Sequence, residues 1–322
     1  MRGYMIDTIR FKLRTNDSSV IKNMIGLLEG SHNVDNGDPS EYYYGNYGDF
    51  RVKVRVNSGK MTFSGSLSKY FKGSNIYDMT RAEIKEACDN LSQEIGCDVS
   101  QAVITRMDIG TNIILDNPVS NYLLTLNTMV GVEGSEYKRL ETTEETVEYR
   151  SNNNEKTYVF YDKTKQKIDT KKPIPNEFVG KNILRYELRF FSRIRDKLNN
   201  GNPVLFADLY NKDFYNKLLI LYVDQYNSIP KGTKLIIDPL SYNNLTPSKL
   251  IKYLAAIGLD VVGYNLLTNQ LDSNKEVIGT TNFNRYGKVL RRIVEDKRFF
   301  MNDSHVEEMD AKINDLILKI EL

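Results

Sequence analysis

Two carboxylates, Asp108 and Glu187, stand in segments where polar and apolar residues alternate. The alternation predicts strands over residues 103–114 and 183–190, each with one polar and one apolar face, and each carboxylate falls on the polar face. If the polar faces align, both carboxylates enter one patch that suits Mg²⁺ or Mn²⁺, since hard cations prefer oxygen ligands. The alternative is a pair of ordinary cross-strand salt bridges, Asp108 with Arg185 and Arg106 with Glu187.

Tyr161 lies near the end of a third predicted strand, residues 157–163, with the sequence TYVFYDK. A tyrosine hydroxyl has an ordinary pKa of about 10 and is a poor nucleophile unless a cation or a metal lies close to it. Lys163 falls on the same face of the predicted strand and could supply that field together with a metal-bound phosphate. The alternative is a packing tyrosine, because the chain contains 21 tyrosines.

Asp7 interrupts the apolar face of the strand predicted over residues 4–13. An unpaired carboxylate on such a face is costly, so a metal, an arginine or backbone donors must compensate it, unless it points into solvent at the strand end. The segment 65–73, GSLSKYFKG, could hold phosphates through backbone N–H groups and Lys69. It lacks the spacing of a Walker loop, and no GxGxxG motif follows a strand, which argues against nucleotide-driven chemistry.

The composition excludes several other kinds of site. The 322 residues include two cysteines, Cys88 and Cys97, and two distant histidines, His32 and His305. A disulfide framework, a Cys-rich zinc site and a His-pair metal site are therefore excluded, and catalysis must use carboxylates, tyrosines, lysines or hydroxyls. No apolar run approaches the ~18–20 residues of a membrane span, and the first residues do not form a signal peptide. We expect no membrane partner and a cytoplasmic location.

The net charge of +2 hides an uneven distribution. Between residues 160 and 200, eleven Lys and Arg accompany five Asp and Glu, an excess of six positive charges, and a second basic stretch covers residues 285–298. Local positive fields of this kind suit a polyanion such as DNA, and a solvated charged face is the alternative. The expected DNA contacts are Lys69, Arg106, Lys165, Arg189, Arg285, Lys288 and Arg292.

The remaining pattern indicates an α+β fold, with a central, mostly antiparallel sheet and flanking helices. Alternation predicts a further hairpin over residues 50–67. Helical spacing predicts helices over residues 18–28 and 80–95, and a polar loop is expected over residues 30–49.

After Gly201 the pattern changes to amphipathic helices. They are predicted over residues 208–226, 246–258, 282–300 and 303–320. The turn-rich segment 199–203, NNGNP, marks the expected domain border. We therefore expect one domain over residues 1–200 and a smaller, mainly helical domain over residues 201–322.

Six stretches together carry a family resemblance: MIDTIRF, GSLSKYFKGSN, ITRMDIGTNI, ETVEYRS, TYVFYDKTKQ and ILRYELRFF. In their order and spacing, from Met5 to Phe191, the sequence resembles phage and plasmid replication initiators of the gene II/X type. It resembles more distantly the rolling-circle plasmid initiators that lack the usual His pair. The resemblance implies a rolling-circle initiator that nicks and rejoins single-stranded or hairpin origin DNA through a 5′-phosphotyrosyl link, leaving a free 3′-OH.

On this resemblance, residues 1–200 would be the catalytic DNA nicking-joining domain. Tyr161, within FYDK, would attack the scissile phosphate, and Lys163 and Arg185 would steady that phosphate. Cations at this place would stabilise the charge of the pentavalent phosphate. The phosphotyrosine would conserve the bond energy, so rejoining would need no ATP.

The same resemblance implies a divalent metal cofactor, Mg²⁺ or Mn²⁺, held by Asp108 within TRMD and Glu187 within RYEL. Asp7 and Glu145 are the candidates for further ligands. Asn112 stands where related plasmid initiators often carry a second carboxylate.

Two other functions remain as alternatives. A mobilisation or conjugative relaxase would use the same chemistry at a different DNA site. A non-catalytic DNA-binding protein on an RRM-like sheet would keep Asp108 and Glu187 in structural salt bridges, although such sheets usually offer aromatic side chains to the nucleic acid. The expected partners are origin DNA and host replication proteins, helicase and polymerase, in a bacterial host. Residues 201–322 would bind duplex DNA or form a homodimer.

Overall fold

The computed structural model describes residues 6–33, 42–126, 137–143, 145–151, 155–229, 231, 233–235, 246–262, 264–295 and 300–319. The strands of its central sheet are β1 (Ile6–Arg14), β2 (Glu29–Asn33), β3 (Tyr42–Tyr47), β4 (Phe50–Arg55), β5 (Lys60–Ser66), β6 (Val103–Leu115), β7 (Tyr137–Thr143), β8 (Thr146–Ser151), β9 (Lys156–Asp162) and β10 (Asn182–Phe190). Their order is β2-β3-β4-β5-β1-β6-β10-β9-β8-β7, and each neighbouring pair is antiparallel. Two short strands, β11 (Thr233–Leu235) and β12 (Phe300–Asn302), form a separate antiparallel ribbon.

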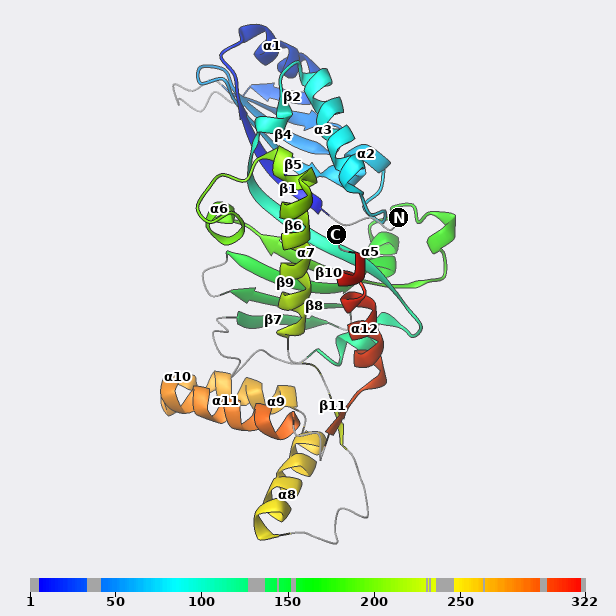
Figure 1. The fold of residues 1–322 in the computed structure, drawn as a ribbon, viewed down its shortest axis with the longest axis vertical. Helices are drawn as coiled ribbons and strands as arrows, with labels where there is room; N and C mark the ends of the chain where they lie inside the picture. The colour runs from blue at the N-terminus through cyan, green and yellow to red at the C-terminus, as the bar shows by residue number, and fades with distance from the viewer. Residues whose placement is uncertain are drawn as a thin grey trace.

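Helices flank the sheet and also form a group beyond its β7 edge (Figure 1). They are α1 (Ser18–Leu27), α2 (Leu67–Lys72), α3 (Arg81–Ile95), α4 (Val119–Leu123), α5 (Lys163–Asp169), α6 (Ile194–Leu198), α7 (Lys212–Asn227), α8 (Pro247–Val262), α9 (Tyr264–Ser273), α10 (Lys275–Ile278), α11 (Thr280–Val294) and α12 (Ser304–Asn314), with 3₁₀ turns η1 (Val99–Gln101), η2 (Asn176–Phe178), η3 (Phe206–Tyr210) and η5 (Ile317–Lys319). In the part of the chain that is described, no helix combines the length and the apolar character needed to cross a bilayer. The expected α+β class, with an antiparallel sheet and a helical C-terminal region, is confirmed.

Most of the predicted strands are present. Those predicted over residues 4–13, 103–114 and 183–190 are β1, β6 and β10, and the hairpin over residues 50–67 is β4 and β5. The polar loop expected over residues 30–49 instead contains β2 and β3. β2 is the edge strand and most of it is exposed, so it lacks the apolar alternation that marks a half-buried strand.

The third predicted strand ends earlier than expected. β9 ends at Asp162, whose carboxylate accepts a hydrogen bond from the Lys165 N–H at 2.9 Å and caps α5. Lys163 is therefore the first residue of a helix and not the end of a strand, because an aspartate that caps the following turn stops the extended chain.

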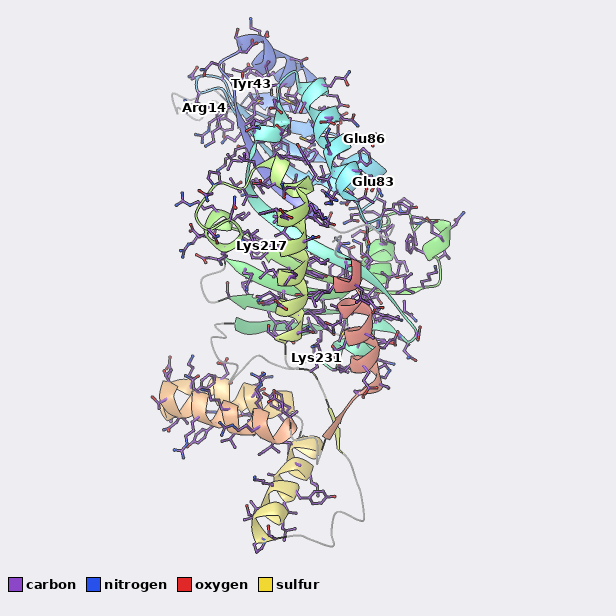
Figure 2. All side chains as sticks on the ribbon, viewed as in Figure 1. Arg14, Tyr43, Glu83, Glu86, Lys217 and Lys231 are labelled. Atoms are coloured by element: carbon purple, nitrogen blue, oxygen red, sulfur yellow. The ribbon has the colours of Figure 1, made fainter. Side chains whose placement is uncertain are left out.

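α7 packs across one face of the sheet, in front of β6, β10 and β9 in Figure 1. The ring of Tyr222 lies 4.5 Å from the ring of Tyr186 on β10, and its hydroxyl donates to the Tyr186 carbonyl at 2.9 Å. Lys217, labelled on this helix in Figure 2, donates to the Leu198 carbonyl and joins α7 to α6. α7 is therefore part of the core of the sheet body.

α12 returns to the same body from the end of the chain. The Tyr226 hydroxyl of α7 donates to Asp310 at 2.6 Å, and Lys231, near the end of α7 in Figure 2, lies 3.4 Å from the same carboxylate. Lys312 donates to the Ile114 carbonyl of β6 at 2.9 Å. These contacts hold α12 against both the sheet and α7.

The sheet body thus contains elements from both sides of residue 200, where the domain border is expected. We propose a different division, with residues 6–229 and 304–319 in one unit and α8 to α11 in a second, which we call the helical unit. The β11–β12 ribbon joins the two, since it pairs the segment that enters the helical unit with the segment that leaves it.

Candidate active site

The strand register brings the predicted site residues onto one face of the sheet. Arg185 on β10 lies opposite Tyr161 on β9 and Asn112 on β6. Glu187 lies opposite Gly110. Directly opposite residues of antiparallel strands point to the same side, so the polar faces align as predicted. We call this side the polar face; α7 packs on the other side, against Tyr186 and Phe160.

A bulge in β1 places Asp7 on the polar face. Ile6 lies opposite Ile109 and Ile9 lies opposite Met107, so three steps along β1 correspond to two along β6. This extra residue reverses the alternation between Ile6 and Ile9. The prediction that Asp7 interrupts the apolar face of its strand is therefore wrong: Asp7 leaves the core side and reaches the side chain of Arg185.

Arg185 is the centre of the site, with an exposed fraction of 0%. Its Nη2 donates to Asp7 Oδ2 at 2.7 Å, and its Nε donates to Glu187 Oε1 at 2.5 Å. Its Nη1 donates to the Asn75 carbonyl at 3.0 Å and to Asn112 Oδ1 at 3.1 Å. A guanidinium with this many partners is fixed in place, and it could steady a phosphate only by leaving them.

Tyr161 lies directly beside this centre and is 8% exposed. Its hydroxyl donates to Glu187 Oε1 at 2.9 Å, and Lys163 Nζ lies 3.4 Å from the same hydroxyl oxygen. Lys163 also donates to Gln166 Oε1 at 3.0 Å, within α5. The hydroxyl is thus held between a carboxylate and an amine.

Burial and neighbouring charges shift the pKa values of these groups in different directions. Burial, with Arg185 nearby, lowers the pKa of Lys163 to about 7. Burial raises the pKa of the Tyr161 hydroxyl, and Glu187 and Asp7 add to this rise. Burial opposes ionisation of Glu187, but Arg185 and Arg189 outweigh it and lower its pKa to about 2. At neutral pH Glu187 is a carboxylate, Tyr161 is a phenol, and Lys163 is close to its midpoint.

Gly110 leaves the space that Glu187 occupies. A Cβ at this position would lie 2.8 Å from Glu187 Cγ and 2.9 Å from the Tyr186 carbonyl oxygen. A glycine within a strand often marks such a close approach, so Gly110 positions the carboxylate that holds Tyr161.

Asp108 forms a second group on the polar face. Both of its oxygens accept from Arg106, at 3.1 and 2.8 Å, and the Arg106 guanidinium lies 4.7 Å from the centre of the Phe191 ring. Burial raises the pKa of Asp108, against the opposing effect of Arg106. The salt bridges considered between β6 and β10 are not the pairs that form, because Asp108 lies opposite Arg189 and pairs along its own strand.

The predicted metal ligands are occupied by protein donors. Asp7 accepts from Ser66, at 2.5 Å, as well as from Arg185; Glu187 accepts from Tyr161 and Arg185 on one oxygen and from Arg189 on the other, at 2.6 and 2.8 Å. Within the described residues, no group of three or more Asp, Glu, His or Cys could hold an ion. This donor set does not form a metal site as it stands, since a cation would have to displace arginines from the carboxylates.

The other predicted residues lie around this site or far from it. Glu145 is exposed and its carboxylate pairs with Lys165 at 3.1 Å. Lys69 lies in α2. Burial lowers the pKa of Lys167, and the nearby positive charge of Lys69 lowers it further. On α11 in the helical unit, three exposed residues form a group that we call the α11 basic face: Arg285, Lys288 and Arg292.

Two residues of the site, Ser66 and Asn75, were not predicted from the sequence. Ser66 caps α2 and donates to Asp7, and Asn75 donates from its amide to Asp7 at 3.3 Å and offers its carbonyl to Arg185. Both lie within GSLSKYFKGSN, one of the stretches that carry the family resemblance, but Lys69 is the residue that the sequence predicts there as part of the site. Their role depends on the β1 bulge, which no pattern in the sequence indicates.

One comparison with known proteins finds a match. The family model for the N-terminal region of a phage replication-associated protein of the gene II type matches residues 5–229, more than half of the chain. The match contains β1 to β10 and α7, and hence every residue of the site described above. A search of curated proteins finds no match.

Proposed function

The chain belongs to the gene II family of phage replication-associated proteins, and on that premise we propose that it starts rolling-circle replication by nicking and rejoining origin DNA through Tyr161. The single observation that carries the proposal is the Tyr161 hydroxyl, held at 2.9 Å from Glu187 and 3.4 Å from Lys163 within the family match. DNA binding follows from the replication role. The tyrosine chemistry is our inference from the geometry.

In the proposed step the Tyr161 hydroxyl turns from Glu187 to the neutral amine of Lys163 and gives it the proton, and the Tyr161 oxygen attacks the scissile phosphorus. The bond between phosphorus and the 3′-oxygen breaks, the 3′-oxygen takes a proton from water, and the 5′-phosphate stays on the tyrosine. Lys163 is the better base of the two neighbours, because a general base works best with a pKa near the working pH. Glu187, with its pKa of about 2, orients the hydroxyl instead.

Arg185 acts as a positioning residue in this scheme. It is fully buried and joins Asp7 to Glu187, and therefore fixes the carboxylate that holds the nucleophile. Once it has gained the proton, Lys163 is the cation beside the phosphate. Arg189, whose side chain is 27% exposed, is the more accessible cation on the same face of the sheet. Positive charge at this place stabilises the phosphorane as it forms.

The small exposed fraction of Tyr161 restricts the form of the substrate. A base-paired duplex is too wide to bring its backbone against an 8% exposed hydroxyl on a sheet, whereas a single strand can bend into the site. We propose that the substrate is single-stranded or extruded DNA. Mg²⁺ or Mn²⁺ as cofactor stays a prediction from the family resemblance, and no step above depends on it.

The test is covalent adduct formation with single-stranded oligonucleotides that tile the origin region of the source replicon. Tyr161→Phe should form no adduct, because the attacking oxygen is missing. The matched control is Tyr158→Phe on the same strand, whose hydroxyl donates to Gln225 at 2.6 Å on the opposite face; it should keep the adduct. An adduct with Tyr161→Phe would overturn the assignment of the nucleophile.

A further inference from the structure

A cavity of about 440 Å³ lies at the end of β6, next to the candidate active site. Its walls come from the connection between α2 and α3, from β6, from η2 and from α12. β6 continues to Leu115, whereas its described pairing with β1 reaches only Ile109. The cavity therefore occupies the side of β6 that β1 does not cover in the described residues.

Two direct links join this cavity to the active site. Asn75 contacts Arg185 and Asp7, and the next residue, Ile76, lines the cavity. The Asn112 amide lies on the shared wall: its oxygen accepts from Arg185 at 3.1 Å, and its nitrogen donates to the Ile76 carbonyl at 2.9 Å.

The distance between the two places is short. Asn112, Arg185 and Tyr161 lie side by side on three neighbouring strands, so the cavity wall and the nucleophile are about 10 Å apart, two strand spacings. A nucleotide in the cavity would be a close neighbour of the scissile phosphate on the same DNA strand.

The lining suits a flat, neutral aromatic group. Tyr77 and Phe178 meet edge to face at 5.8 Å between ring centres, and both line the cavity and are partly exposed. The volume falls within the ~300–1,000 Å³ usual for small-molecule sites. Aromatic side chains are the usual stacking platform for bases of a single strand.

The cations of the cavity favour a base over a free polyphosphate. Lys72 pairs with Glu83 at 2.8 Å, and Lys312 pairs with Glu308. Because both ammonium groups already have carboxylate partners, the cavity carries little uncompensated positive charge for a triphosphate. A neutral nucleobase would need no such charge.

We propose that this cavity, the base pocket, takes one unpaired nucleobase of the DNA strand that is cut at Tyr161, stacked against Tyr77 and Phe178. This inference rests on the proposed function, because it makes the pocket part of the same DNA site. It assigns to the pocket the choice of the cleavage position, since a base seated there sets which phosphate meets the nucleophile.

The test uses the full chain and a single-stranded oligonucleotide that forms the adduct. If no adduct forms, the tightest-binding single strand of the origin region replaces it. A fluorescent adenine analogue, whose emission is quenched by stacking, is placed at each position in turn. One position near the nick should respond on binding. Tyr77→Ala and Phe178→Ala should each abolish that response and weaken binding roughly 5- to 150-fold, the range for a lost base stack.

Tyr77→Phe is the matched control, because it keeps the ring and loses only the hydrogen bond to Glu177 at 2.8 Å. It should retain the fluorescence response. An abasic sugar at the responding position should weaken DNA binding by the wild-type protein and leave DNA binding by Phe178→Ala unchanged. If both alanine variants bind as wild type, or if no position responds, the base pocket is overturned. The Tyr161 adduct reports separately on the proposed function, so the two failures are distinguishable.

Discussion

Replacement of Asp7 by Asn tests whether the buried charge network holds the sheet together at the active site. Asp7 has 6% side-chain exposure and lies 2.7 Å from Arg185, which has 0%. In the wild type two carboxylates, Asp7 and Glu187, balance two guanidinium groups, Arg185 and Arg189. The substitution leaves the shape almost unchanged but leaves one positive charge in excess in a buried site.

The expected cost follows from that imbalance. Removal of one partner from a buried ion pair typically costs about 3–5 kcal/mol, because the remaining charge stays desolvated. Arg185 keeps Glu187 at 2.5 Å, so we expect the lower end, about 3 kcal/mol. Asn at position 7 can still accept from Ser66, which separates loss of charge from loss of a hydrogen bond.

Urea unfolding at pH 7, followed by near-UV circular dichroism of the tyrosines, measures this cost as a lower midpoint at unchanged slope. The matched control is Asp89→Asn, which removes an aspartate at 2.6 Å from Lys85 where both side chains are well exposed, at 60% and 58%. Solvent screening makes such a pair nearly worthless, so its midpoint should not move. Equal midpoints for the two variants would refute the reasoning from burial.

Four further perturbations test other parts of the site. Gly110→Ala should cost about 1–3 kcal/mol of folding free energy and slow adduct formation at least tenfold, because its Cβ would lie 2.8 Å from Glu187 Cγ. The control is Gly26→Ala, whose Cβ would have nothing within 4 Å. In the same unfolding and adduct assays it should change neither the stability nor the rate. The rate of adduct formation should rise with pH through about 7, as Lys163 loses its proton. Lys163→Arg should lose this rise, and a variant with the wild-type pH–rate profile would exclude Lys163 as the base. Alanine at all three positions of the α11 basic face should lower the salt dependence of duplex binding by ~2–3 units of slope while adducts with short oligonucleotides persist; an unchanged slope in a salt titration would remove this face from the DNA site. The family resemblance implies that a chelator stops adduct formation and that Mg²⁺ or Mn²⁺ restores it, which would require the cation to displace Arg185 from Asp7 and Glu187; full activity in the chelator would contradict a metal cofactor.

The alternation of polar and apolar residues predicts a strand where one face of that strand is buried. β6 and β10 alternate in sequence because one side packs under α7, and so the alternation alone could place Asp108, Glu187 and Arg185 each on the polar face of its own strand. Only the register between β6 and β10 brings these faces together. β2 could not be found in this way, because an exposed edge strand has no apolar side to repeat. The early end of β9 depends on one side-chain hydrogen bond at Asp162, which composition alone does not distinguish from an ordinary strand residue.

The candidate site was harder to predict than the sheet that carries it. Simple alternation puts Asp7 on the core side, and only a one-residue bulge in β1 brings it to Arg185. Which carboxylate pairs with which arginine was also not predictable, since each could reach several partners across the strands. Asn75 enters the site through its backbone carbonyl, a group that every residue carries and that no residue type reveals.

On the proposed division, α12 returns to the sheet body, and the helical unit is an insertion and not a tail. Both of its connections pass through the β11–β12 ribbon, so the chain leaves the sheet body and comes back at neighbouring points. Such an insert can be exchanged between related proteins as a cassette without opening the core that receives it. A truncation after α11 would have the opposite effect, because it would remove the cover of Tyr226 and of β6 near Ile114. For exchanging the helical unit, the ribbon is therefore the place to cut and splice.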